Sequence, residues 1–380
     1  MNRSALVLVT SSYPIAGDGS EAAGSFVADL VEEIAKHVPV RVVAPGPIST
    51  REQWAERIEI YRYPAPSRPL STLRLWHPAD QLRIAKVLHA GMQATREAST
   101  QGAGHILALW GLPCGQWARK AAKETGLAYS VWMLGSDVWS LGRIPLLRGI
   151  LSRVIRDAHR AYADGYQLAE DARRIGDSSV HFLPSTRRIN LKDPAKPRET
   201  PPYRMLFLGR WHPNKGIDIL LDALAKFDTD TWKKIEKIEI NGGGPLEPLV
   251  HERANALRNM GHPISVGGYL TKSEAEAAIA RADWLLIPSR IESIPVVFSD
   301  AMKLGRPVVA MPVGDLPILL HRAPCGVLAS RANAAAYCDA LRTALATPPS
   351  LLVDGVKTTS SHFDLPTIAK QITQQVSDHD

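Results

Sequence analysis

The feature that most constrains the fold is a regular alternation of short apolar runs with longer amphipathic stretches. This alternation is typical of a parallel β-sheet whose strands are joined by crossover helices, so we expect an α/β protein. The expected helices of the first half include residues 24–36, 79–97 and 115–125. The expected strands are residues 5–9, 40–44, 59–63, 105–109, 129–133, 160–163, 180–183, 204–208, 237–241, 264–266, 284–287, 308–310 and 326–328.

The alternation is interrupted between residues 184 and 202, where prolines and charged residues replace it. Proline, charge and the loss of periodicity predict a linker, here at 186–202. A chain of 380 residues is long enough for two domains with separate cores. We therefore expect two Rossmann-like domains, 1–185 and 203–355, whose parallel sheets face a central cleft at the carboxyl ends of their strands.

Composition excludes several other classes of protein. With 45% hydrophobic and 22% charged residues, the chain is neither disordered nor collagen-like. No apolar run approaches the roughly 18 residues of a membrane-spanning helix, and the run at 5–9 is too short for the core of a signal peptide. The cysteines, Cys114, Cys325 and Cys338, indicate neither a disulfide framework nor a zinc site. We expect a soluble protein of the reducing cytoplasm.

The net charge of +7 is concentrated in two segments. Residues 138–160 hold five arginines and one aspartate, and residues 186–200 hold five basic and two acidic residues. These surpluses of four and three account for the whole net charge. The balance elsewhere argues against an extended nucleic-acid groove, and the sequence has no zinc-finger or RNP-type motif. We expect no nucleic-acid partner.

The first basic segment is also amphipathic. If residues 146–160 form a helix, apolar residues occupy one side, and Arg153, Arg156 and Arg160 occupy the opposite side. Two interpretations remain open. Either the helix packs on its own domain with its arginines in solvent, or the arginines attract an anionic lipid surface, at about 1 kcal/mol per cation.

The first candidate binding motif lies between an expected strand and an expected helix in the second half of the chain. Gly209 and Gly216 allow the backbone to approach a ligand closely. Arg210 and Lys215 place two cations where the turn into a helix presents N–H donors. This combination suits a diphosphate. The alternative is an ordinary loop whose two cations are solvated.

The second motif is a run of three glycines, Gly242, Gly243 and Gly244, at the end of the next strand. Such a run permits close contact between the backbone and phosphates or a sugar. Consecutive glycines also serve tight turns, so this motif by itself leaves both readings open.

The third motif follows the buried strand expected at 284–287. A loop carries Glu292, a helix is expected to begin near Val296, and Asp300 lies eight positions after Glu292. The amides at the start of the helix would favour an anion, and the two carboxylates could accept hydrogen bonds from hydroxyls of a sugar and a ribose. The alternative is that Glu292 is a simple loop acid and Asp300 a solvated helix residue.

In their order and spacing the three motifs resemble the donor-binding half of the GT-B glycosyltransferases, in particular the retaining family 4, or glycosyl transferases group 1. The family pattern of Gly-Arg…Lys-Gly, a Gly-rich loop and Pro-Ser-x-x-Glu-x7-Glu-Ala matches here, except that the second acid is Asp300. The resemblance covers nearly the whole chain. It includes the first helix, which begins at Gly24, the Gly-Ser-Asp motif that ends at Asp137, and the final helix at 363–371.

The resemblance implies an enzyme that moves a sugar from a nucleotide-diphosphate sugar to a hydroxyl acceptor, with retention, in the synthesis of a surface polysaccharide or glycolipid. The first domain would bind a glycan or lipid-linked acceptor, and the second would bind the donor. Residues 356–380 would form a helix that crosses back to the first domain. Peripheral contact with the inner face of the cell membrane would use Arg153, Arg156 and Arg160. The donor is a co-substrate, and no cofactor is expected.

The resemblance also implies roles for individual residues. Arg210 and Lys215 would neutralise the donor diphosphate as the glycosidic bond breaks, and Glu292 would hydrogen-bond the transferred sugar; these three form the expected catalytic set. Asp300 would bind the ribose. The other expected donor-binding residues are Gly209, Gly242, Gly243, Gly268, Tyr269, Ser293, Pro295, Val296 and Val297, of which Gly268 and Tyr269 would hold the base. The expected acceptor-side residues are Gly24 and Asp137.

Two positions depart from the family pattern. The chain has Leu134 where the family often has a histidine that approaches the donor sugar, and the side chain of Asp300 is one methylene shorter than that of glutamate. Both changes are compatible with an active transferase. They are also compatible with a non-catalytic relative that binds a nucleotide sugar or a partner. A GT-B-fold nucleotide-sugar epimerase is a further alternative.

Two weaker patterns point elsewhere. Asp228-Thr229-Asp230 matches the Asp-x-Asp motif that holds a metal in other glycosyltransferases, but no strand precedes it, so we expect a solvated loop and no obligatory metal. Glycines at 17, 19 and 24 faintly resemble a dinucleotide fingerprint, but the G-x-G-x-x-G order is missing. A loop that faces a phosphate or the acceptor is therefore expected there instead of an NAD site.

Overall fold

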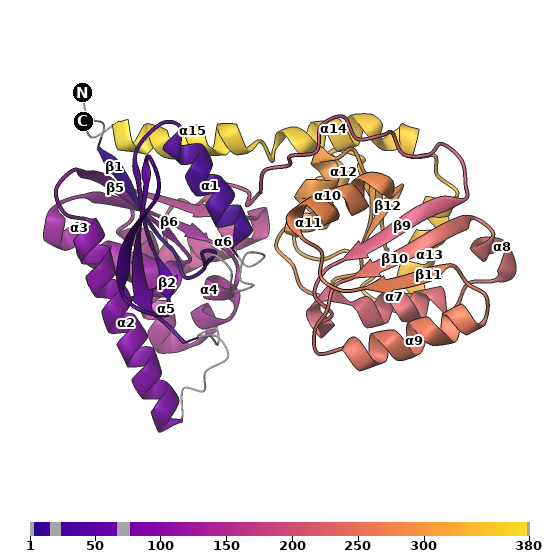
Figure 1. Cartoon of the computed structure of the whole chain (residues 1–380), viewed down its shortest axis with the longest axis horizontal. Coiled ribbons are helices and arrows are strands. Elements are labelled where there is room, and N and C mark those ends of the chain that lie inside the picture. The colour runs from indigo at the N-terminus through magenta and orange to yellow at the C-terminus, as the bar shows by residue number, and fades with distance from the viewer. Residues whose placement is uncertain (1–3, 16–23, 67–76, 378–380) are drawn as a thin grey trace. The chain divides into compact units, whose positions relative to one another are not determined.

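The computed structural model (Figure 1) describes residues 4–15, 24–66 and 77–377. The chain divides into two compact units. Unit 1 consists of Met1–Arg187 together with Leu365–Asp380, and unit 2 is Arg188–Asp364. Each unit has its own sheet, and the described residues form two buried cores in unit 1 and one in unit 2. Within the described residues, no helix is both long enough and apolar enough to span a bilayer.

Unit 1 is built on an eight-stranded sheet with the order β3-β4-β2-β1-β5-β6-β7-β8. All neighbouring strands are parallel except β3 and β4, which are antiparallel. The strands are β1 (Ala5–Val9), β2 (Val40–Gly46), β3 (Thr50–Ala55), β4 (Ile58–Pro64), β5 (Ala103–Leu109), β6 (Ala128–Met133), β7 (Arg160–Ala163) and β8 (His181–Phe182).

Helices cover both faces of this sheet because its central strands are apolar at successive positions. In β1, Leu6 and Leu8 pack on one face with α1 and α15, and Val7 and Val9 pack on the other face with α2, α3, α5 and α6. The helical segments are α1 (Ser25–Ala35), α2 (Pro78–Ala98), η2 (Gly111–Gly115), α3 (Gln116–Thr125), α4 (Ser136–Trp139), η3 (Leu141–Arg143), α5 (Pro145–Arg156), α6 (Tyr166–Gly176) and α15 (Leu365–Ser377).

Unit 2 contains a six-stranded sheet in which every neighbouring pair is parallel, with the order β11-β10-β9-β12-β13-β14. The strands are β9 (Tyr203–Leu208), β10 (Ile235–Asn241), β11 (Ile264–Gly267), β12 (Trp284–Ile287), β13 (Val308–Ala310) and β14 (Gly326–Leu328). The helical segments are η4 (Pro213–Lys215), α7 (Ile217–Leu224), α8 (Thr229–Trp232), α9 (Glu247–Asn259), α10 (Lys272–Arg281), α11 (Val296–Lys303), α12 (Leu316–Arg322), α13 (Ala334–Leu345), η5 (Pro349–Leu352) and α14 (Val353–Ser361).

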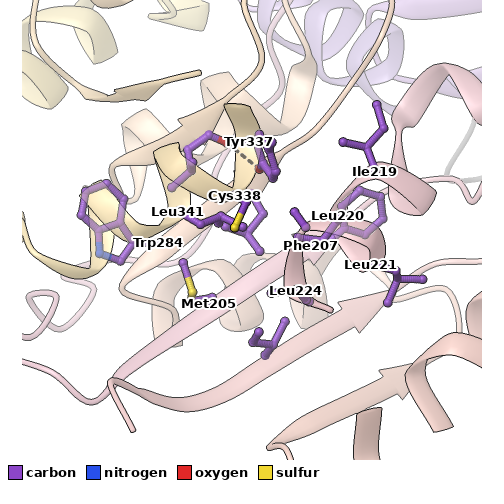
Figure 2. Close-up of a cluster of buried hydrophobic side chains, with 14 of the residues drawn as sticks. Met205, Phe207, Ile219, Leu220, Leu221, Leu224, Trp284, Tyr337, Cys338 and Leu341 are labelled. Atoms are coloured by element: carbon purple, nitrogen blue, oxygen red, sulfur yellow. Dashed lines mark hydrogen bonds between the residues drawn. The ribbon is translucent and has the colours of Figure 1, made fainter. Parts of the chain in front are cut away.

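The core of unit 2 fixes the position of β9, from which the first binding motif extends. Figure 2 shows Met205 and Phe207 of β9 among side chains of α7 and α13, including Leu220 and Tyr337. The hydroxyl of Tyr337 donates a hydrogen bond to the backbone oxygen of Val309 in β13, at 2.9 Å. Helix and sheet are thus joined by a polar contact inside an apolar core, which satisfies the buried hydroxyl.

The proline-rich segment at residues 188–202, here called the strap, contains neither helix nor strand. It belongs to unit 2 and is held against the rest of that unit by hydrogen bonds. The buried carboxylate of Glu276 accepts hydrogen bonds from the backbone N–H groups of Asn190 and Leu191, both at 2.9 Å. One side chain of α10 therefore holds two consecutive amides of the strap.

Two further buried charges hold the strap. Asp283 accepts a hydrogen bond from the backbone N–H of Arg198 at 2.7 Å. The guanidinium of Arg306 donates to the backbone oxygens of Ala195 and Ala280. The basic strap is thus tied to unit 2 through its backbone, by side chains that would be costly to bury without partners.

Candidate functional site

The sheet of unit 2 changes its direction of winding between β9 and β12. From β9 the chain adds β10 and β11 on one side, and it then returns to place β12, β13 and β14 on the other (Figure 1). In open α/β sheets, ligands bind at this kind of switch point, outside the carboxyl ends of the strands. The first and third binding motifs follow β9 and β12, so the sheet order places them together.

An ion pair joins these two loops. Lys215, the last residue of η4, places its Nζ 2.5 Å from Oε1 of Glu292 in the loop after β12. The hydroxyl of Ser289 donates to the same oxygen at 2.9 Å. The side chain of Glu292 is 10% exposed and that of Lys215 is 36% exposed. The structure thus brings together two of the three residues predicted to be catalytic.

A second ion pair holds the same two loops beside the first. The guanidinium of Arg290 donates to both carboxylate oxygens of Asp218, at 2.8 and 2.7 Å, and to the backbone oxygen of Pro213 at 2.7 Å. The backbone N–H of Arg290 donates to the oxygen of Asn214 at 2.8 Å. Hydrogen bonding to Arg290 lowers the pKa of Asp218. The sequence motifs did not predict this pair, here called the clamp, although its signal was opposite charges soon after the strands β9 and β12: Asp218 in the first turn of α7 and Arg290 in a loop.

The close contact of the loops depends on Gly216. Its φ is +67°, and a Cβ there would lie 1.9 Å from the backbone oxygen of Pro288. A side chain at this position would therefore push the loop after β12 away from the loop after β9. The last residue before the helix α7 is a glycine for a steric reason as well as a conformational one.

The glycine-rich loop after β10 packs against the loop after β9. A Cβ at Gly242 would lie 2.0 Å from the backbone oxygen of Gly209, and the backbone N–H of Trp211 donates to the oxygen of Gly243 at 2.8 Å. The glycines at these predicted positions allow two backbones to meet. Close packing between the two loops is thus at least part of their role; the tight-turn alternative stays open.

Arg210 and Tyr269 lie exposed beside this loop. Among the described residues, none accepts a hydrogen bond from the guanidinium of Arg210, so this cation remains open to a ligand. Tyr269, 66% exposed, follows β11 next to the exposed Gly268 and donates its hydroxyl to the oxygen of Gly243 at 2.7 Å. An aromatic ring and a cation thus flank the same backbone loop.

The start of α11 lies at the end of the same loop as Glu292. The helix begins at Val296, as predicted, and its N-cap, Pro295, has no side-chain hydrogen bond to the helix. The first N–H groups of a helix lack partners within it, so Val296 and Val297 can donate to an anion. The hydroxyl of Ser293 is buried and has no hydrogen-bond partner in the described parts of the chain, which is consistent with a ligand group at this place.

Asp300 is fully buried in α11, so its interpretation as a solvated residue is wrong. Its proposed contact with a ribose stays a prediction, because a fully buried carboxylate reaches a ligand only after side chains around it move.

The predicted acceptor-side residues lie in unit 1. Asp137 is fully buried and accepts hydrogen bonds from the backbone N–H groups of Gly111 at 2.7 Å, Gly135 at 3.0 Å and Val138 at 3.1 Å. Burial raises the pKa of this carboxyl. Asp137 therefore fixes the loops after β5 and β6, and contact with an acceptor stays a prediction.

Gly24 precedes α1 with a φ of +90°. The other glycines of the predicted N-terminal loop, at 17 and 19, fall outside the described residues. The half-buried Leu134 packs against one of the two cores of unit 1, in place of the histidine of the family pattern.

The Asp-x-Asp pattern is the beginning of a helix, so the prediction of a loop is wrong at this point. Asp228 caps α8, where its Oδ1 accepts a hydrogen bond from the N–H of Thr231 at 2.8 Å, and Asp230 pairs with Lys233 at 2.9 Å. Each carboxylate has a local structural partner. Within the described ranges, no group of three or more His, Cys, Asp or Glu residues is placed to hold a metal.

Comparison with known proteins identifies the class first. Sucrose-phosphate synthase from Thermosynechococcus elongatus superposes with a TM-score of 0.75 at 17% identity, over 99% of both chains. HepE from Anabaena, solved in complex with UDP, gives a TM-score of 0.69 at 16% identity, over 99% of this chain and 100% of that one. The predicted fold is confirmed: the chain has the GT-B fold.

Sequence comparison then shows which family the second half of the chain resembles. Residues 202–347 match the family described as Glycosyl transferases group 1. The D-inositol 3-phosphate glycosyltransferase of Corynebacterium glutamicum is 33% identical over 146 residues, which make up 37% of this chain and 34% of that protein. The homologue from Corynebacterium efficiens is 25% identical over 322 residues, 70% of this chain and 73% of that protein. The predicted resemblance to this family is confirmed.

Proposed function

We propose that the chain is a glycosyltransferase that moves a sugar from a nucleotide-diphosphate sugar to a hydroxyl acceptor, with retention of configuration. The observation that carries the proposal is the ion pair of Lys215 and Glu292 at the switch point of the group 1 segment, with the open cation of Arg210 nearby in the same loop. A diphosphate requires cations, and a sugar requires hydrogen-bond acceptors; this site offers both.

The proposed chemistry is electrostatic. Arg210 and Lys215 neutralise the diphosphate as it leaves, and the amides of Val296 and Val297 bind phosphate oxygens beside the buried hydroxyl of Ser293. These groups occupy the role that a metal has in other transferases, so we propose that the reaction is metal-independent. In the retaining reaction, the acceptor hydroxyl attacks from the face that the diphosphate leaves.

The remaining donor contacts that we propose are those that the resemblance to the family implies. Glu292 accepts hydrogen bonds from the transferred sugar, Asp300 binds the ribose, and Gly268 and Tyr269 hold the base. The backbones of the loops that contain Gly209, Gly242 and Gly243 border the phosphates. HepE has been solved with UDP and with UDP-glucose, which supports a nucleotide-sugar donor for a chain of the same fold.

The proposal is tested by incubation with a panel of UDP-, GDP- and ADP-sugars, after a thermal-shift screen that identifies the bound nucleotide, because a ligand that binds only the folded state raises apparent stability. Lys215→Ala should reduce turnover at least tenfold, or about 1.4 kcal/mol in activation free energy. Unchanged turnover in this variant would remove the proposed role of Lys215. Binding without turnover favours a non-catalytic relative, and interconversion of the sugars favours an epimerase.

For the acceptor we propose a glycan or lipid-linked molecule of surface polysaccharide or glycolipid synthesis, met at an anionic membrane surface on the cytoplasmic side. The amphipathic reading of α5 is supported by burial of Leu151 on one side and exposure of Arg153 and Arg156 on the other. The helix is shorter than predicted, and the exposed Arg160 lies beyond it, at the start of β7. At the start of α5, Leu146 is 74% exposed beside the exposed Arg148. An exposed leucine among arginines is what a helix offers to a lipid interface.

Co-sedimentation with vesicles of anionic and of neutral lipid tests this surface. The combined variant Arg153→Gln, Arg156→Gln and Arg160→Gln should lose binding to anionic vesicles. A control variant with three exposed cations of unit 2 replaced, Lys233→Gln, Arg331→Gln and Lys357→Gln, should retain binding. Equal binding by both variants, or no binding by the unchanged protein, contradicts the membrane proposal.

A further inference from the structure

We propose that the ion pair between Lys215 and Glu292 makes the site select nucleotide-sugars against the free nucleoside diphosphate. This inference rests on the proposed function and assigns to Glu292 a second role besides binding the sugar. The starting observation is that Lys215, which is proposed to bind a phosphate, already has a counter-ion in the structure: its Nζ lies 2.5 Å from Oε1 of Glu292.

The carboxylate is held in place from several sides. Ser289, which is buried, donates to the same oxygen that Lys215 contacts. The backbone before it is tied by the N–H of Arg290, and the backbone after it by the oxygen of Ser293, which accepts from the N–H of Asp315 at 3.1 Å. Glu292 is only 10% exposed, so water solvates its charge weakly. The carboxylate therefore cannot leave simply by swinging into solvent with its loop.

A phosphate that binds Lys215 must consequently compete with Glu292. When the phosphate wins, the carboxylate loses its main charged partner and lies next to a second anion, which is unfavourable at a poorly solvated position. Within the described part of the chain, no group donates to the second oxygen of Glu292, Oε2, that could compensate for this loss.

A sugar attached to the diphosphate supplies the missing compensation. Its hydroxyls donate hydrogen bonds to Glu292, and hydrogen bonds to an ionised acceptor are among the strong ones. A free nucleoside diphosphate lacks the hydroxyls of the transferred sugar, so this penalty is not offset. The pair thus favours the substrate over the nucleotide product, and it promotes release of the product after the sugar has been transferred.

Calorimetric titration of the whole chain with UDP, GDP and ADP and with their glucose derivatives tests the inference. For the nucleotide that the unchanged protein binds, Glu292→Gln should tighten binding of the free diphosphate about tenfold, or about 1.4 kcal/mol, because the competing charge is gone. Binding of the nucleotide-sugar should be unchanged or weaker. The ratio of the two dissociation constants should therefore change at least tenfold.

Two variants serve as controls. Glu236→Gln removes one negative charge from the same unit, at a carboxylate that pairs with Arg198 and Arg204 at the start of β10, and it should leave the ratio within twofold. Glu292→Asp keeps the charge, and it should keep weak binding of the free diphosphate. Circular dichroism verifies that each variant is folded.

The outcomes separate this inference from the proposed function. If the unchanged protein binds none of the nucleotides or nucleotide-sugars, both are overturned. If it binds and turns over a nucleotide-sugar, but Glu292→Gln leaves the affinity for the free diphosphate unchanged or weakens it, the inference alone is wrong. If Glu236→Gln tightens binding of the free diphosphate as much as Glu292→Gln does, the cause is the change in net charge of the unit, and the ion pair has no selective role.

Discussion

The two units share one architecture but differ in the acid that lies at the carboxyl ends of their strands. In each, a largely parallel sheet reverses its winding, between β1 and β5 in unit 1 and between β9 and β12 in unit 2, and loops meet at the carboxyl ends of the strands. In unit 1, the acid in those loops is Asp137, fully buried and engaged by three backbone amides. In unit 2, it is Glu292, paired with a half-exposed lysine.

The two carboxylates show how burial and hydrogen bonding separate a structural role from a ligand-binding role. A carboxylate that accepts three backbone N–H groups has little capacity left for a ligand, so it fixes loops. A carboxylate that pairs with one partly exposed cation can exchange that partner for another. The reactive charges of this chain are therefore expected in unit 2, while Asp137 holds the loops after β5 and β6 in unit 1.

The largest expected effect is on the loop contact of unit 2. Gly216→Ala places a Cβ against the backbone of Pro288 at a positive φ, and should lower the free energy of unfolding of unit 2 by about 3 kcal/mol and abolish turnover. Gly126→Ala in unit 1 has a similar φ, +77°, but meets nothing within 4 Å, and should cost about 1 kcal/mol. Native-state hydrogen exchange measures each unit separately. Equal costs would show that the contact with Pro288 has no energetic weight.

The next largest effect concerns the loops that Asp137 holds in unit 1. Asp137→Asn replaces an acceptor of three amide bonds with a group that also carries donors, and should destabilise unit 1 by about 2 kcal/mol. Asp157→Asn, at an exposed carboxylate of the same unit, should cost about 0.5 kcal/mol. Titration calorimetry should find donor affinity unchanged in both. A clear loss of donor affinity in Asp137→Asn would contradict the assignment of donor binding to unit 2.

A smaller effect concerns the clamp of unit 2. Asp218→Asn should cost about 1 kcal/mol at neutral pH, since the pair with Arg290 is bidentate but partly exposed to screening solvent. Turnover should also fall several-fold, because the clamp positions the loops of Lys215 and Glu292. Asp339→Asn, at an exposed pair on α13, should change neither quantity.

The clamp also predicts a pH dependence with a definite sign. The pKa of Asp218 is lowered from 3.8, so its contribution is present above that value and is lost as pH falls through the folded pKa. The cost of Asp218→Asn should therefore shrink below pH 3.8 in urea unfolding experiments. Asp137 has a raised pKa, so the stability linked to its protonated form has the opposite pH dependence: it is fully present below pH 3.8 and is lost as pH rises through the folded pKa. A cost for Asp218→Asn that grows on acidification would contradict this assignment.

The smallest effect is at the base side of the site. Tyr269→Phe removes the hydrogen bond to Gly243 and should raise the dissociation constant of the nucleotide about threefold, for a loss of about 0.6 kcal/mol in ring positioning. Tyr203→Phe removes a similar bond to the backbone of Glu199 at the other end of the sheet, and it should leave nucleotide binding unchanged. Equal effects of the two variants would remove Tyr269 from the site.

The strands were predictable where both faces are buried. Strands such as β1 and β12 have the predicted bounds, because a strand covered by helices on both faces needs apolar residues at every position. The strand β3 was not predicted. It is antiparallel, lies at the edge of its sheet, and its sequence Thr-Arg-Glu-Gln-Trp-Ala is mostly exposed, so no apolar run reveals it.

The site was predictable as separate loops but not as an arrangement. Glycines and charged residues at strand ends indicated Lys215 and Glu292 as separate candidates. Their pairing depends on β9 lying next to β12, and local sequence does not predict the order of strands in a sheet. The burial of Asp137 and Asp300 was likewise not predicted, since it arises from packing between elements that are distant in the chain.

The final helix should keep the chain associated after cleavage of the backbone between the two units. Leu365, Ile368, Ala369 and Ile372 of α15 are buried in a core of unit 1, although the segment just before α15 belongs to unit 2. A single cut in the peptide backbone between residues 187 and 188 would thus leave two fragments, of which the second still carries a helix that the first requires. We expect such fragments to remain associated through purification and, if produced separately in one cell, to reassemble.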